Sequence, residues 1–212
     1  ERIVCVGNIM IDSYELLRER IAADRSAHDL PVKPGRYGVV TLHRPSNVDS
    51  ENALRAIVAA LVKSSEELAF IFPVHPRTRE RLERFRLLRD LEAAANIHVT
   101  GPLSYIPFMS LVRRAKMVIT DSGGIQEETT YLNIPCLTLR DTTERPITVT
   151  CGTNKLVRCD TLLREVDSIM RGEWKKGTKP ELWDGQTAKR VAESLKARVN
   201  HITLETQATS LG

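Results

Sequence analysis

The sequence is poor in aromatic residues, which make up 5% of its 212 residues. They do not alternate with arginines as in proteins that stack single-stranded nucleic acid, so we expect no nucleic-acid partner. No apolar run approaches the roughly 20 residues of a membrane span, and no signal peptide is recognisable, so we expect no membrane partner. The excess of 31 lysines and arginines over 27 aspartates and glutamates is small, at +4. It suits an anionic small molecule.

Cysteines are also few, and none forms a C-x-x-C pair; they are Cys5, Cys136, Cys151 and Cys159. This pattern favours reduced structural thiols over disulfides or a metal centre, as in a cytoplasmic protein. We therefore expect a cytoplasmic location, no bound metal and no cofactor. The length allows one well-packed core, or one and a half domains.

Apolar, β-branched runs alternate regularly with segments of helical periodicity. We predict strands at 37–42, 68–74, 96–100, 117–120, 135–139 and 155–157, and helices at 50–64, 78–91, 105–115, 124–132, 161–170 and 186–200. This alternation is typical of βαβ units, and predicts an α/β fold with a Rossmann-like, doubly wound parallel sheet. Ligands of such sheets bind at the carboxyl ends of the strands.

The start of the chain follows a different pattern. Residues 2–7 have the composition of a buried strand, a helical pattern follows to about residue 21, and 25–36 is a polar linker. A strand without a preceding partner predicts an upstream domain. We therefore divide the chain into 1–36 (the last strand of a missing first domain, with interdomain helix and linker), 37–200 (the Rossmann-like domain) and 201–212 (a tail).

The strand at 117–120 leads through Asp121, Ser122, Gly123 and Gly124 into a helix. The start of a helix has unpaired N–H groups and the positive end of the helix dipole, and glycines let a phosphate approach the backbone. Glu128, one turn later, is within reach of a ribose diol. The alternative is a tight turn in which glycine only relieves strain.

Three further strand ends carry polar groups: 41–49 with His43 and Arg44, 72–78 with His75, and 139–146 with Arg140, Glu144 and Arg145. They predict a proton-transfer group and several cations at one sheet edge. A histidine held in a turn, or an arginine–aspartate tether, would be a structural alternative. The arginines between 77 and 89 favour a solvated helix face over a polyanion site.

Together these motifs resemble the non-hydrolysing UDP-N-acetylglucosamine 2-epimerases. The matching segments are 43–49, 73–78, 121–128 and 140–146, with Gly7-Asn8, Ile11-Asp12 and 182–185 also fitting. The resemblance covers residues 2 to about 200. It implies the GT-B architecture, in which two Rossmann-like domains enclose a cleft, with this chain as the C-terminal half.

The resemblance also implies a set of site residues. The implied catalytic residue is His43, which assists the departure of UDP. Ser122, Gly123 and Gly124 would hold the diphosphate and Glu128 the ribose, while the backbone at Phe108 would read the uracil. The implied substrate contacts are Arg44, His75, Phe108, Ser122, Gly123, Gly124, Glu128, Arg140, Glu144 and Arg145.

The implied reaction interconverts UDP-GlcNAc and UDP-ManNAc by elimination of UDP and re-addition with inversion at C2, without a metal. The family's carboxylates for the C2 proton lie in the first domain, so we expect this chain to bind UDP-GlcNAc or UDP without turnover. Expected partners are that first domain and a possible second copy in a homodimer. The alternatives are a hydrolysing 2-epimerase that releases ManNAc and UDP, a glycosyltransferase donor domain, and a non-catalytic UDP-sugar sensor.

Overall fold

The computed structural model describes residues 3–26 and 30–209, with side chains through residue 199. The strands are β1 (Tyr37–Thr41), β2 (Ala69–Pro73), β3 (Ile97–Thr100), β4 (Met117–Thr120), β5 (Cys136–Leu139) and β6 (Asn154–Val157). The helices are α1 (Ile9–Ala23), α2 (Pro45–Val48), α3 (Glu51–Ser64), α4 (Pro76–Arg84), α5 (Leu88–Ala93), α6 (Tyr105–Val112), α7 (Gly123–Leu132), α8 (Pro146–Thr150), α9 (Cys159–Met170) and α10 (Thr187–Thr209).

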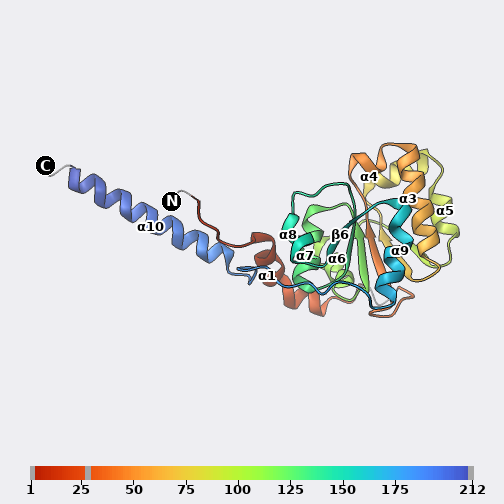
Figure 1. The fold of residues 1–212 in the computed structure, drawn as a ribbon, viewed down its shortest axis with the longest axis horizontal. Coiled ribbons are helices and arrows are strands. Elements are labelled where there is room, and N and C mark those ends of the chain that lie inside the picture. The colour runs from red at the N-terminus through yellow and green to blue at the C-terminus, as the bar shows by residue number, and fades with distance from the viewer. Residues whose placement is uncertain (1–2, 27–29, 210–212) are drawn as a thin grey trace.

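The six strands form one parallel sheet in the order β3-β2-β1-β4-β5-β6. Figure 1 shows the sheet beside its helices, with the edge strand β6 labelled. Val39 of β1 lies opposite Ile71 of β2 on one side and Val118 of β4 on the other. The chain begins the sheet at β1 and winds outward in both directions, so the strand order reverses between β1 and β4. That point is where doubly wound sheets bind ligands.

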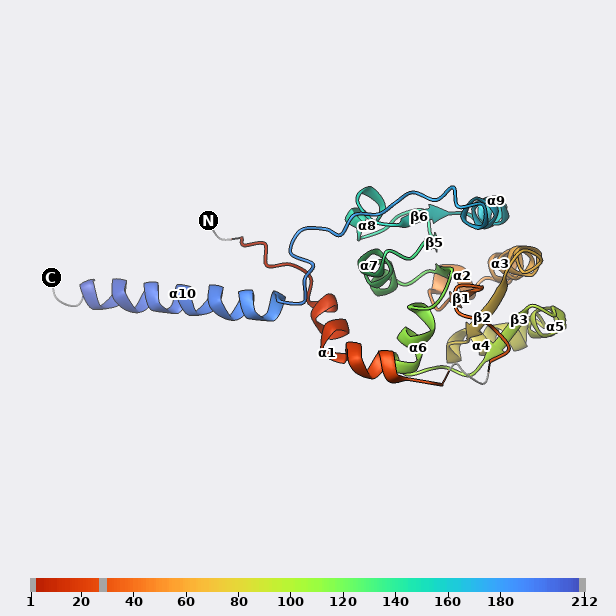
Figure 2. The ribbon, with the colours of Figure 1, turned by 90° about the horizontal axis from the view of Figure 1, so that it is seen from below.

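Helices cover both faces of the sheet (Figure 2). One face packs against α3, α4, α5 and α9 in the larger hydrophobic cluster, and the other against α1, α6 and α7 in the smaller one. Burial on both faces explains why the strands are almost continuously apolar. The predicted α/β class and doubly wound parallel sheet are confirmed.

Helix α3 illustrates how the sequence determines an element. Its residues Leu54, Ile57, Val58 and Leu61 recur at helical spacing and are all buried, as predicted. The Ser50 hydroxyl accepts a bond from the Ala53 N–H and begins the helix. Burying each such side chain contributes roughly 1.5–3 kcal/mol, so this face fixes the helix on the sheet.

The predicted helix at 78–91 is wrong in one respect, because it is two helices. Arg86 has a φ of 59° and ends α4, and the Leu87 N–H closes the turn on the Leu82 carbonyl at 2.8 Å. Leu82, Leu87 and Leu91 all remain buried, so the break keeps the apolar face on the core.

The strand predicted at the start of the chain, as the last strand of a first domain, is not formed within the described residues. Residues 3–7 form no strand, and the side chains of Ile3 and Val4 are exposed. A strand needs a neighbour for its backbone bonds, and the described residues provide none here. Arg2 lies outside the described residues, and an upstream domain that pairs with this segment remains a proposal.

The first turn of α1 and the residues before it are fixed to the start of α10 and the loop that precedes α10. Asp12 accepts bonds from the N–H groups of Thr187 and Ala188, at 3.0 and 2.7 Å. Gly7 has a φ of 107°, and a Cβ at this position would lie 2.4 Å from the Leu182 carbonyl oxygen, so only glycine fits. The motifs at 7–12 and 182–185, distant in sequence, therefore form one junction.

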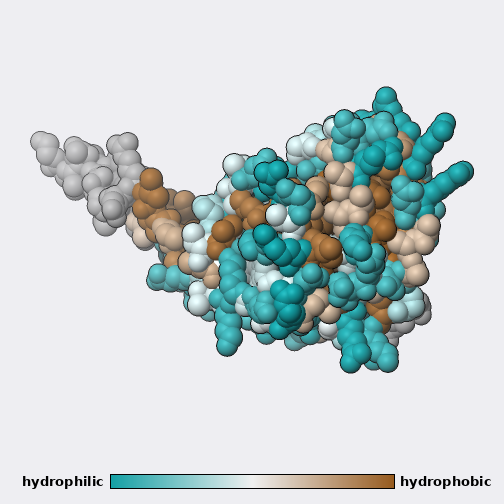
Figure 3. All heavy atoms as spheres, turned by 45° about the vertical axis from the view of Figure 1, so that its right-hand side comes forward, coloured by the Kyte–Doolittle hydropathy of each residue, from teal (hydrophilic) through white to brown (hydrophobic). Residues whose placement is uncertain are grey.

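From this junction α10 projects away from the sheet domain (Figures 1 and 2). It continues to Thr209, so most of the tail predicted from residue 201 is helical, and 210–212 lie outside the described residues. Hydrophobic surface gathers where the helix leaves the domain (Figure 3), and the described part of α10 includes the exposed apolar side chains Val191, Leu195 and Val199. None of the described helices is both long and apolar enough to cross a membrane.

Candidate functional site

The start of α7 lies at the carboxyl edge of the sheet, directly after β4. Ser122 is the N-cap residue, but its side chain makes no capping bond. The first N–H groups of a helix have no partner within the helix, so this end remains an anion-binding position. A Cβ on Gly123 would lie 3.6 Å from the Glu144 Oε1 atom, and one on Gly124 3.6 Å from the Met10 methyl carbon.

A cavity of about 220 Å³ lies beside this helix start. Its lining residues are Thr41, His43, Pro73, His75, Pro102, Leu103, Phe108, Ser122 and Ile125. The rings of His43 and His75 are 5.7 Å apart, although they follow different strands. Four of the predicted site residues, His43, His75, Phe108 and Ser122, are therefore brought together.

Asp121 fixes the histidine and arginine of the first motif. Its carboxylate accepts the backbone N–H of His43 at 3.1 Å, that of Arg44 at 2.9 Å and the Asn47 amide at 3.1 Å. The His43 Nδ1 atom lies 3.1 Å from the same carboxylate. Burial by itself would raise the pKa of Asp121, but donors from His43, Arg44 and Asn47 hold the pKa below its ordinary value.

Two cations meet one carboxylate next to Gly123. Arg44 Nη2 and Arg140 Nη1 each lie 2.7 Å from an oxygen of Glu144. The backbone N–H of Glu144 and these two guanidinium groups lower the pKa of Glu144 to about 2. The predicted residues Arg44, Arg140 and Glu144 thus form one ionised cluster at the helix start.

Arg145 makes a different contact from its neighbours. Its Nε atom lies 3.0 Å from Glu127 Oε1, which also accepts a bond from the Asn8 amide at 2.9 Å. Asn8 is the N-cap residue of α1. Glu127 therefore connects the segment that precedes α1 to the loop at 140–145.

Glu128 is buried between α6 and α7 and does not line the cavity. The Tyr105 hydroxyl donates to its Oε1 atom at 2.7 Å. Burial raises the pKa of Glu128 to about 7, and the nearby Glu127 adds to this effect, while the Tyr105 bond opposes it. A ligand can reach this carboxylate only when neighbouring side chains move.

Phe108 lines the cavity with its side chain, but its backbone N–H donates to the Ser104 carbonyl at 3.0 Å within the first turn of α6. A base that accepts a bond from this N–H would have to replace the helical bond.

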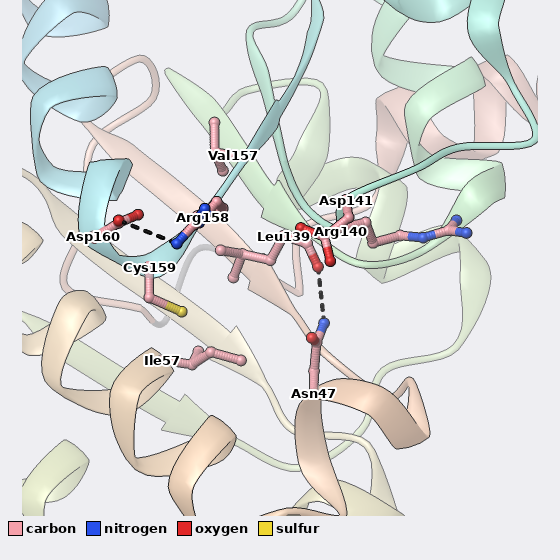
Figure 4. Close-up of a pocket in the computed structure, with 9 residues that line it drawn as sticks. All are labelled: Asn47, Ile57, Leu139, Arg140, Asp141, Val157, Arg158, Cys159 and Asp160. Carbon is pink, nitrogen blue, oxygen red and sulfur yellow. Dashed lines mark hydrogen bonds and ion pairs between the residues drawn. The ribbon is translucent and has the colours of Figure 1, made fainter.

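A second cavity, of about 350 Å³, lies at the ends of β5 and β6. Of the predicted residues it includes Arg140 alone, whose guanidinium points away from the cavity (Figure 4). Asn47 connects the two regions, because its amide donates to both Asp121 and the Leu139 carbonyl. The described residues contain no group of three histidine, cysteine or acidic side chains that could hold a metal.

Sequence reasoning assigned no site role to Asp121, Tyr105 or Glu127. Asp121 had a usable signal, because it is an acid placed directly between a buried strand and the Ser-Gly-Gly turn. Tyr105 and Glu127 had none, since their contacts with Glu128 and Asn8 depend on how α6 and α1 pack against α7.

Known proteins resemble this chain in sequence and in fold. The profile of the family described as UDP-N-acetylglucosamine 2-epimerase matches residues 1–196. A UDP-N-acetylglucosamine 2-epimerase of Methanocaldococcus jannaschii is 36% identical over 202 residues, which are 92% of this chain and 54% of that protein. The structure of the M. jannaschii UDP-GlcNAc 2-epimerase in complex with UDP-GlcNAc and UDP superposes with a TM-score of 0.78 at 33% identity, and the match covers 91% of this chain and 55% of that one.

A UDP-2,3-diacetamido-2,3-dideoxy-D-glucuronate 2-epimerase of Pseudomonas aeruginosa is 38% identical over 157 residues. That match covers 74% of this chain and 42% of the relative. The chain thus spans about half the length of the curated relatives it matches.

Proposed function

Because the chain belongs to the UDP-N-acetylglucosamine 2-epimerase family, we propose that it is the nucleotide-sugar-binding half of an enzyme that interconverts UDP-GlcNAc and UDP-ManNAc. The observation that carries this proposal is the meeting of His43, Arg44, Arg140 and the uncapped start of α7 at the point where the strand order reverses. A diphosphate needs such a combination of cations, free N–H groups and helix dipole.

The diphosphate lies at Ser122, Gly123 and Gly124 in this proposal, with the uridine directed into the cavity beside Phe108. His43 stands next to the leaving diphosphate. Its Nδ1 atom is held by Asp121, so Nε2 is the nitrogen left to stabilise the charge that develops on UDP as the C1–O bond breaks. The ribose reaches Glu128 after a side-chain rearrangement, because that carboxylate is buried.

We assign proton transfer at C2 to residues outside this chain. Three carboxylates near the helix start are already engaged: Asp121 by His43 and Arg44, Glu127 by Asn8 and Arg145, and Glu144 by Arg44 and Arg140. Glu128 is buried and does not line the cavity. Epimerisation also needs a base and an acid on two sides of the sugar, which one face of a cleft does not supply. Incubation of this chain with UDP-GlcNAc in deuterium oxide should give neither UDP-ManNAc nor deuterium at C2, and deuterium incorporation would contradict the assignment.

Calorimetry with UDP, UMP and uridine tests the site itself. The affinity should increase from uridine to UMP to UDP, because the cations and the helix start act on the phosphates. Arg140→Gln should weaken UDP and leave uridine unchanged, while Arg171→Gln, at the far end of α9, should change neither. Equal affinity for uridine and UDP would contradict a phosphate site.

The P. aeruginosa relative supports a second candidate, in which the same half binds another UDP-linked 2-acetamido sugar. The two candidates share the UDP contacts and differ only in the sugar. Competition of UDP-GlcNAc and UDP-GlcNAc-derived uronates against bound UDP would distinguish them.

A further inference from the structure

The Glu144 carboxylate lies where an anionic ligand is expected. Its Oε1 atom is 2.7 Å from Arg44 Nη2, and its Oε2 atom is 2.7 Å from Arg140 Nη1. The same Oε1 is 3.6 Å from the position that a Cβ would take on Gly123, at the positive end of α7. One carboxylate of the chain thus engages both cations beside the helix start.

We propose that Glu144 is an internal placeholder anion, which occupies the phosphate position in the absence of ligand and competes with the incoming diphosphate for Arg44 and Arg140. The identity of the ligand rests on the proposed function, whereas the competition itself concerns any polyphosphate. Glu144 would then determine how much negative charge a ligand needs in order to bind.

Arg44 has hydrogen bonds that do not depend on Glu144, and Arg140 is positioned by its burial and its backbone. Arg44 donates from Nε to the Asp121 carbonyl at 3.0 Å and from its backbone N–H to the Asp121 carboxylate. The Arg140 side chain is only 13% exposed, and its backbone N–H is bound to the Thr138 carbonyl at 2.9 Å. Loss of the carboxylate should therefore leave two positioned cations without their counter-ion.

Glu144 itself is free to move aside. Its side chain is 46% exposed and lies in the loop between β5 and α8. The backbone on either side is held, because the Thr143 hydroxyl donates to Gln126 at 2.6 Å and accepts the Arg145 N–H at 3.0 Å. Rotation of one side chain would clear the helix start without unfolding the loop.

Two effects oppose each other when the carboxylate is removed. A ligand no longer has to break two existing ion pairs, which strengthens binding. The arginines also lose a partner that restricts them, which weakens binding. Because Arg44 keeps its bonds to Asp121 and the Arg140 side chain is largely buried, we expect the first effect to dominate and Glu144→Gln to bind UDP roughly three- to tenfold more tightly.

The experiment is calorimetry of the 212-residue protein and of Glu144→Gln with UDP, inorganic pyrophosphate and uridine. UDP and pyrophosphate should both bind more tightly to the variant, and uridine should be unaffected. Glu173→Gln is the matched control, because it removes the same charge from an arginine pair, Arg171–Glu173, that follows the far end of α9. Glu144→Ala should change affinity in the same direction, and thermal unfolding should show that all variants are folded.

Equal or weaker binding of both UDP and pyrophosphate by folded Glu144→Gln and Glu144→Ala would overturn the placeholder. Tighter pyrophosphate binding together with equal affinity for UDP and uridine would support it and contradict the proposed function. If the wild type binds UDP more tightly than uridine but the variants bind UDP no more tightly than the wild type, the proposed function is supported and the placeholder is contradicted. Absence of any binding of UDP or pyrophosphate by any of the proteins would overturn both.

Discussion

Two buried carboxylates, one before the start of α7 and one in the middle of α7, have pKa values shifted in opposite directions. Asp121, at the end of β4, is fully buried and accepts bonds from two backbone N–H groups and the Asn47 amide. Glu128, between α6 and α7, is 2% exposed and accepts a bond from Tyr105. Within the described residues we find no second donor to Glu128.

The number of donors decides the charge. Burial disfavours the ionised form of both groups. At Asp121 the donors overcome burial and lower the pKa, whereas at Glu128 one hydroxyl does not, and burial raises the pKa to about 7. Burial alone therefore does not predict the protonation state of a carboxylate, and the donors around it must be known.

The difference in donors also favours different roles for the two residues, a structural role for Asp121 and a ligand-binding role for Glu128. The protein itself satisfies Asp121, which suits a residue that holds His43 and Arg44 in place. Glu128 retains acceptor capacity that the protein does not use. In the proposed function a ribose diol brings two O–H donors to Glu128, and so supplies the bonds that the ionised form lacks.

Asp121→Ala should give the largest effect. It leaves two backbone N–H groups and one N–H of the Asn47 amide without their acceptor in the interior, and we expect a loss of about 3–5 kcal/mol in the free energy of unfolding. The lowered pKa means that the stabilisation by wild-type Asp121 is present above the unfolded pKa near 3.8 and is lost as the pH falls through the folded value. Urea unfolding at pH 7 measures the loss.

Asp141→Ala is the control for this experiment, because Asp141 is exposed on the neighbouring loop. Its effect should stay within about 0.5 kcal/mol. Comparable losses of unfolding free energy in the two variants would mean that the hydrogen bonds to Asp121 do not stabilise the fold more than an exposed carboxylate does.

The parts of the fold that depend on the local sequence could be predicted, and the parts that depend on contacts between distant residues could not. The predicted strands agree with the observed ones to within one residue at each end, because a parallel sheet buried on both faces requires continuous apolar runs. The break at Arg86 could not be predicted, since an arginine gives no signal for a left-handed backbone. Residues 3–7 have the composition of a strand, but a strand also depends on a partner that the described residues do not contain.

The sequence predicts which residues of the candidate site lie at the carboxyl edge of the sheet, but it does not predict the contacts between them. Parallel strands carry whatever follows them to one edge, so the sequence alone is enough to expect His43, His75 and Ser122 together. The donors to Asp121 come from residues 78 and 77 positions away, and the Tyr105 contact depends on the angle between α6 and α7. Such pairings depend on packing across elements, which periodicity does not encode.

Glu128→Gln should give the second largest effect, and it appears in the pH dependence of stability. The folded protein keeps a proton on Glu128 up to about pH 7, whereas the unfolded chain releases it near 4.5. Wild-type stability relative to the variant should therefore fall as the pH rises through this window, by roughly 2–4 kcal/mol in total.

Urea unfolding of wild type and Glu128→Gln between pH 4 and pH 8.5 measures this difference, and the other titrating groups cancel because both proteins share them. Glu92→Gln, on an exposed part of α5, should show no such window. A difference in unfolding free energy that does not change with pH would mean that folding does not raise the pKa of Glu128, and the contrast with Asp121 would be lost.

Tyr105→Phe should give the smallest effect and the sharpest comparison, because Tyr105 is the one donor to Glu128 among the residues that the structure describes. The Tyr105 bond favours the charged form of Glu128, so its loss should raise the pKa of Glu128 further and extend the window of falling stability above pH 7. At pH 5, where Glu128 is neutral, we expect a loss of about 0.5–1 kcal/mol, and at pH 8.5 about 1.5–3 kcal/mol, because a hydrogen bond to a charged acceptor is the stronger one. In the Glu128→Gln background the Tyr105→Phe loss should become independent of pH. A loss that still increased with pH there would show that the hydroxyl acts on another group, such as the nearby Tyr14, and that donor number is not what separates the two carboxylates.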